Sequence, residues 1–255
     1  MNQKKVTQSF FLFLQIIITL VYGAIIVHMT QILYLANPDS FIDEIITYLP
    51  QFVILVSSII PQIVIRAKRK LHTQDGEIYP LLFTMVALQA TLVIPKYSEV
   101  TEMFFVDPSV LAILGRFSLL GAAVLFLIAS LRYYGFNSSK IDHYIFASLA
   151  AVLLISIIAP ISSLKKENTM NVFNSQYDVY IQIAIVLIYV ATITTFFVYA
   201  LNDKSPVNTK RFFGFLFVIV GLYLSITYTF IPAIISSVLY LVGIIILTFN
   251  TRESF

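Results

Sequence analysis

The chain has 255 residues, of which 59% are hydrophobic and only 11% are charged. In soluble globular domains about a quarter of the residues are charged, so this composition excludes a soluble fold. The net charge of +3 is spread over short segments, which argues against a nucleic-acid partner, and the absence of cysteine excludes disulfides, thiolate nucleophiles and cysteine-bound metals.

Apolar runs long enough to cross a bilayer recur along the chain. A hydrocarbon core of about 30 Å needs roughly 20 helical residues at 1.5 Å each. The sequence therefore predicts an all-α, polytopic integral membrane helical bundle of about eight transmembrane helices, with residues 1–255 forming a single transmembrane domain. The expected spans are 9–35, 47–65, 79–95, 108–131, 143–160, 179–201, 212–230 and 232–249.

The first two spans and the loop after them carry distinctive residues. Span 9–35 follows Lys4 and Lys5 but is too long for the apolar core of a secretory signal, so we expect it to be retained. In the second span, Pro61 is expected to kink the helix, with Ser57 and Ser58 adapting locally. The densest basic cluster follows this span and is formed by Arg66, Lys68, Arg69 and Lys70. We expect this cluster to set orientation and to contact lipid headgroups or a partner.

Lysine and arginine in short loops are retained on the cytoplasmic side. One set of segments holds Lys4, Lys5, Arg66, Lys68, Arg69, Lys70, Arg132, Lys140, Lys204, Lys210, Arg211 and Arg252. The opposite set holds only Lys96, Lys165 and Lys166. We therefore expect the N-terminus and C-terminus to be cytoplasmic. The basic asymmetry and the Ile-, Phe-, Lys- and Asn-rich composition favour a multi-pass protein of a bacterial cytoplasmic (inner) membrane.

The last two spans are separated only by Pro232. One continuous helix over 212–249 would be about 57 Å long, nearly twice the hydrocarbon thickness, and Pro232 would interrupt its hydrogen bonds. We therefore expect two spans with a tight turn at Pro232. Seven spans are the alternative if the turn does not form.

Four polar residues are candidates for a ligand-binding site. Arg116 lies about 12 Å below the start of its helix at Pro108, and a buried ionisable residue in a span is a functional candidate. His28, Gln31 and Gln89 fall in the same half of the membrane, so the four could line a pocket for a carboxylate or phosphate. In the alternative interpretation, Arg116 snorkels and the other three bond to neighbouring helices.

Acidic residues are expected to be absent from the interior of every span. That argues against proton relays, acid–base hydrolysis and magnesium sites in the membrane. The three histidines, His28, His72 and His143, are too scattered for a metal cluster, and no metal or cofactor is expected.

Three functions remain open from the sequence. The first is a non-enzymatic, receptor-like or accessory subunit that binds a ligand, a lipid or another membrane protein. The alternative is a facilitator or small transporter for an anionic or neutral solute, favoured by Arg116 and by a possible hairpin repeat in which Tyr79 to Pro95 has the spacing of Tyr144 to Pro160. The third is an intramembrane lipid-modifying enzyme, which would need Asp107 or Asp178 as its acid.

Overall fold

The structure is a computed structural model that describes residues 3–36, 38, 41–67, 74–102, 106–133, 141–159, 176–203, 205–226 and 229–250. Its elements are α1 (Gln3–Ala36), α2 (Phe41–Ser57), α3 (Ile59–Ala67), α4 (Gln74–Leu88), the 3₁₀ segment η1 (Gln89–Val93), α5 (Ile94–Thr101), α6 (Pro108–Tyr133), α7 (Ile141–Ile158), α8 (Gln176–Asp203), α9 (Pro206–Leu224) and α10 (Phe230–Asn250). Over these described ranges, eight helical stretches are long and apolar enough to cross a membrane. The prediction of an all-α, polytopic bundle is confirmed.

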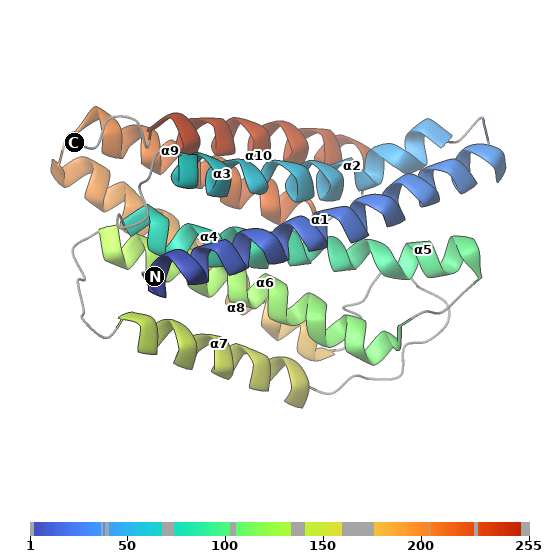
Figure 1. Cartoon of the computed structure of the whole chain (residues 1–255), viewed down its shortest axis with the longest axis horizontal. Helices are drawn as coiled ribbons and strands as arrows, with labels where there is room; N and C mark the ends of the chain where they lie inside the picture. The colour runs from blue at the N-terminus through green and yellow to red at the C-terminus, as the bar shows by residue number, and fades with distance from the viewer. Residues whose placement is uncertain are drawn as a thin grey trace.

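The helices run up and down along one long axis, and the two termini lie at the same end (Figure 1). We call this the basic end, because the helix ends there carry Arg66, Arg132, Lys210 and Arg211. The other end, the acidic end, carries Asp43, Glu44, Glu99 and Asp178. The basic end is the one that the sequence predicts to face the cytoplasm.

The second span is interrupted at Ser58, where α2 ends and α3 begins. Pro61 has no amide hydrogen, so the carbonyl of Ser57 loses its partner one turn later. The hydroxyls of Ser57 and Ser58 donate to the carbonyls of Val53 and Ile54, each over 2.5 Å. The kink predicted from Pro61 and its two serines is thus seen as a break in the helix.

The third span extends from Ile78 to Thr101, beyond the predicted end at residue 95. It continues through η1 into α5, which has Pro95 in its first turn. Because Pro95 cannot donate to the carbonyl of Thr91, the amide of Ile94 donates there instead, in the tighter 3₁₀ pattern. The sequence analysis therefore placed the end of this span wrongly and missed its interruption.

The last two spans are separate, as predicted, but the turn precedes Pro232. Helix α9 ends at Leu224 and α10 begins at Phe230, which puts Pro232 in the first turn of α10, where its missing amide hydrogen costs nothing. The predicted boundary at residue 230 is therefore wrong. The two helices approach so closely that a Cβ atom on Gly243 would lie 2.8 Å from the carbonyl oxygen of Gly214.

Two buried clusters fill the bundle. The larger joins α2, α4, α6, α8, α9 and α10 around aromatic rings, including Phe196 and Phe215, which stack with centroids 4.3 Å apart. The smaller joins α1 to α2, α4 and η1 around Met29 and Tyr48. Helix α7 lies at the edge of the bundle and packs on α6 (Figure 1). Pro160, part of the possible hairpin repeat, lies outside the described residues.

Candidate functional site

Arg116 forms a buried ion pair that joins three helices. Its side chain is 1% exposed, its Nη2 atom lies 2.7 Å from Oδ1 of Asp178, and its Nε donates to the same oxygen over 2.8 Å. Its Nη1 also donates to the carbonyl of Ala159 over 2.9 Å. Ala159 follows the end of α7, so this carbonyl is one of those that a helix leaves without an internal partner. Arg116 therefore ties the end of α7 and the start of α8 to α6.

One acid, expected in a loop, is buried where a span begins. Helix α8 begins at Gln176, three residues before the predicted span, and this places Asp178 in its first turn with 1% of its surface exposed. The carboxylate is tolerated there because Arg116 neutralises it. An anionic ligand would have to displace Asp178 to reach the guanidinium.

The other three candidates of the predicted pocket lie apart from this pair. His28 is bonded through Nδ1 to the hydroxyl of Tyr97 over 2.8 Å, Gln31 is exposed, and Gln89 is buried in η1. Among the described residues, no hydrogen bond joins Arg116 to any of them. The structure thus places Arg116 in a closed ion pair, and ligand binding by these four residues stays a prediction.

The basic cluster after the second span is only partly described. Arg66 donates from Nη1 to the hydroxyl of Ser9 over 3.2 Å. Lys68, Arg69 and Lys70 lie outside the described residues. Binding of lipid headgroups or a partner at this cluster therefore stays a prediction.

The two acids that an intramembrane enzyme would need have structural roles. Asp178 is held by Arg116. Asp107 is exposed and caps α6, since its Oδ1 accepts the amide hydrogen of Ser109 over 2.7 Å. This hydrogen bond lowers the pKa of Asp107 below its usual value, which favours the ionised carboxylate, a form with no proton to donate.

A buried network of amides joins α1, α3 and α4, and the sequence analysis did not anticipate it. The Nε2 atom of Gln62 donates to Oε1 of Gln15 and lies 3.2 Å from the carbonyl of Pro80 and 3.4 Å from the hydroxyl of Thr84. The Thr84 hydroxyl itself donates to that carbonyl over 2.6 Å. Since a carbonyl accepts only, the nitrogen of Gln62 must face Pro80, and this fixes the orientation of both amides.

Several buried polar atoms on the first three spans have no hydrogen-bond partner among the described residues. Five of them belong to four residues: they are Nε2 of Gln15, Oγ1 of Thr19, Oε1 of Gln62, and both amide atoms of Gln89. The three glutamines are 3% exposed or less. Leaving a buried donor or acceptor unpaired costs about 1–3 kcal/mol, so such groups in an otherwise well-packed bundle call for a ligand or water. We call these five atoms and their four residues the amide site.

Polar contacts hold α1 to the second and third spans along most of its length. Ser9 bonds Arg66 near the basic end, Gln15 bonds Gln62, the Tyr22 hydroxyl lies 3.0 Å from that of Thr91, and His28 bonds Tyr97. From Ser9 to His28 the helix rises about 28 Å, close to the hydrocarbon thickness. Gln15, Thr19 and Tyr22 share one face of α1, at the i, i+4, i+7 spacing.

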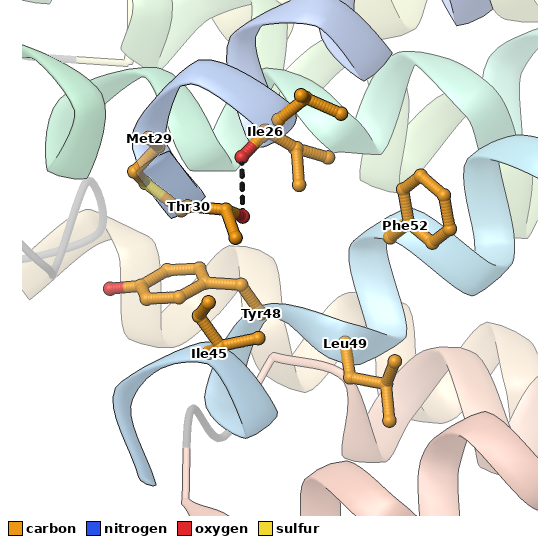
Figure 2. Close-up of a pocket in the computed structure, with 8 residues that line it drawn as sticks. Ile26, Met29, Thr30, Ile45, Tyr48, Leu49 and Phe52 are labelled. Carbon is orange, nitrogen blue, oxygen red and sulfur yellow. Dashed lines mark hydrogen bonds between the residues drawn. The ribbon is translucent and has the colours of Figure 1, made fainter. Parts of the chain in front are cut away.

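A hollow lies between α1 and α2, toward the acidic end (Figure 2). It has a volume of about 180 Å³ and is lined by Ile26, Val27, Met29, Thr30, Ile45, Tyr48, Leu49 and Phe52. We call it the α1–α2 groove. Its lining is almost entirely apolar, unlike the amide site.

Comparison of the chain with protein-family models, with curated proteins and with solved structures finds no match. Function must therefore be argued from the amide site, the ion pair and the groove.

Proposed function

We propose that this chain is a non-enzymatic facilitator for small, uncharged, hydrogen-bonding solutes in a bacterial cytoplasmic membrane. The observation that carries the proposal is the amide site, whose residues lie on α1 and on two spans that are both interrupted. Unpaired buried amides offer donors and acceptors but no charge, so they match a solute such as an amide, urea or a small polyol.

The two interruptions lie at similar depth. Ser58 is nine residues from Ala67, and Gln89 is eleven residues from Ile78, so each break is about 14 to 16 Å from the basic end. The two spans are antiparallel neighbours, and α2 packs directly against η1. Irregular backbone at membrane depth is tolerated where it is enclosed by protein or lines a polar passage, and broken helices near the midplane often mark solute sites.

The ion pair argues against anionic solutes. Such solutes were a candidate because of the positive charge of Arg116, but Asp178 neutralises that charge. The described residues of the amide site carry no charge that could offset the desolvation of an ion. The absence of charge at the amide site therefore favours neutral solutes over anionic ones.

Solute entry into liposomes tests the proposal. The purified chain is reconstituted, and swelling is followed by stopped-flow light scattering with urea, acetamide and glycerol as separate probes. We expect at least one probe to enter faster than in protein-free liposomes, and Gln89→Leu to reduce that rate, because it removes an amide from the site. Gln31→Leu, which changes an exposed glutamine outside the site, is the matched control and should keep the wild-type rate.

Wild-type swelling equal to that of protein-free liposomes for all three probes would refute the facilitator. Equal effects of Gln89→Leu and Gln31→Leu would remove the amide site from the mechanism.

A receptor-like or accessory subunit is the second candidate. It is favoured by the closure of the interior, because Gln62 and Gln15 bond each other and the third span is the most buried of the eight described stretches. Such a protein would bind the same solutes without passing them. A higher melting temperature in the presence of a probe, with no swelling, would select this candidate.

A further inference from the structure

The α1–α2 groove is lined by residues of both helices. On α2 its lining residues run from Ile45 to Phe52, about 10 Å along the helix axis. Figure 2 shows Ile26, Met29 and Thr30 of α1 facing Ile45, Tyr48 and Leu49 of α2 across the hollow. Only Thr30 and Tyr48 have polar side chains, and the hydroxyl of Thr30 donates to the carbonyl of Ile26 over 2.7 Å.

The groove belongs to the surface that faces the bilayer. Val27 and Phe52 line it and are 51% and 39% exposed. Apolar residues beyond it on the same helices, including Leu20 and Ile42, are more exposed still. In a chain with eight membrane-spanning stretches, such a surface is covered by lipid hydrocarbon.

The size of the groove indicates what occupies it. Its volume of about 180 Å³ is below the roughly 300 Å³ at which pockets for whole drug-sized molecules begin, so it accommodates part of a flexible chain. It begins near the start of α2, so a chain would enter from the leaflet at the acidic end.

We infer that the α1–α2 groove is a binding site for one acyl chain of a phospholipid from the leaflet at the acidic end. This site is separate from the amide site and does not depend on the proposed facilitator function. Because lipid tails are as apolar as the lining, retention of the chain rests on close packing. Filling the groove should therefore release the lipid.

Two valines of α1 provide a matched pair for the test. Val27 lines the groove and Val21 does not, yet they are 51% and 52% exposed. Val27→Trp fills the groove, whereas Val21→Trp adds the same ring elsewhere on the lipid-facing surface. Val27→Ala widens the groove and confirms that position 27 tolerates change.

The full-length chain is reconstituted in vesicles of dioleoylphosphatidylcholine, extracted in a maltoside detergent and analysed by native mass spectrometry. We expect the wild type, Val21→Trp and Val27→Ala to retain a phospholipid that Val27→Trp loses. Equal retention by Val27→Trp and the wild type would overturn the inference, as would a wild type that retains none. A dimer broken by Val27→Trp but not by Val21→Trp would also overturn it, since a second copy would then occupy the groove.

Discussion

The ion pair between Arg116 and Asp178 allows a quantitative prediction about stability. Replacing Arg116 by methionine keeps an unbranched side chain but removes the positive charge that neutralises the buried carboxylate of Asp178. Breaking a buried ion pair from one side costs about 3–5 kcal/mol. The carbonyl of Ala159 also loses its donor, which costs about a further 1 kcal/mol.

The double variant Arg116→Met/Asp178→Leu should be much closer to the wild type than the sum of the two single variants. Both charges are then absent, and apolar replacements of buried ion pairs are often neutral. The hydrogen bond to the carbonyl of Ala159 is among the interactions that the double variant still loses. The difference between the double variant and the sum of the singles measures the coupling within the pair.

A more exposed pair at the same end is the control. Lys96 lies 3.4 Å from Glu99, and their side chains are 14% and 43% exposed, against 1% and 2% in the buried pair. Ion pairs near the surface contribute about 0–1 kcal/mol. Thermal unfolding in detergent is followed by circular dichroism. The melting temperature should fall strongly for Arg116→Met and only slightly for Lys96→Met. Equal losses for these two, or additive losses in the Arg116/Asp178 double variant, would refute the reasoning.

Three further predictions concern other parts of the bundle. Gly243→Ala should destabilise by about 1–3 kcal/mol, because its Cβ would meet the carbonyl of Gly214, whereas Gly23→Ala, with nothing within 4 Å, should be neutral or stabilising in the same melting assay. Gln89→Leu should stabilise the fold, because it removes an unpaired amide. Gln62→Leu should destabilise the fold, because it breaks the amide network. The opposite signs would contradict the hydrogen bonding described. The pKa of Asp107 is lowered in the folded chain, so the stability from its cap is present above the usual pKa and is lost as pH falls through the lowered one. Asp107→Asn should remove that part of the acid sensitivity of the melting temperature, and an unchanged pH profile would contradict the cap.

The spans could be predicted from the sequence because their length and apolar character are set by the bilayer. The interruption near Ser58 was also predictable, since Pro61 lies inside the span and removes a backbone hydrogen bond there. The 3₁₀ segment before Pro95 was not. A proline near a span end is compatible with termination of the helix or with its continuation through a tighter turn. In this chain the helix continues, because η1 packs against α2 and α6.

The predicted site was less accurate than the fold, for two physical reasons. A shift of three residues in the start of α8 moved Asp178 from an expected loop into the bundle, and single-sequence boundaries are uncertain by that amount. Of the amide site, only Gln89 was predicted as a binding residue, because glutamines were considered only in the half of the membrane that holds Arg116. The signal for it was present, since Gln15 and Tyr22 lie seven residues apart on one face of an otherwise apolar helix.

Charge and hydrogen bonding are separated within this bundle, and that separation predicts a selectivity. The buried charges of Arg116 and Asp178 cancel at the acidic end, whereas the amide site contains only neutral groups. An ion at such a site would lose its hydration without gaining an opposite charge, a penalty of several kcal/mol. A neutral amide or polyol loses far less and pairs with the free donors and acceptors. Acetamide should therefore enter liposomes containing the chain faster than formate at neutral pH, although formate is smaller. Faster entry of formate would show that the ion pair opens during transport and that Arg116 contacts the solute.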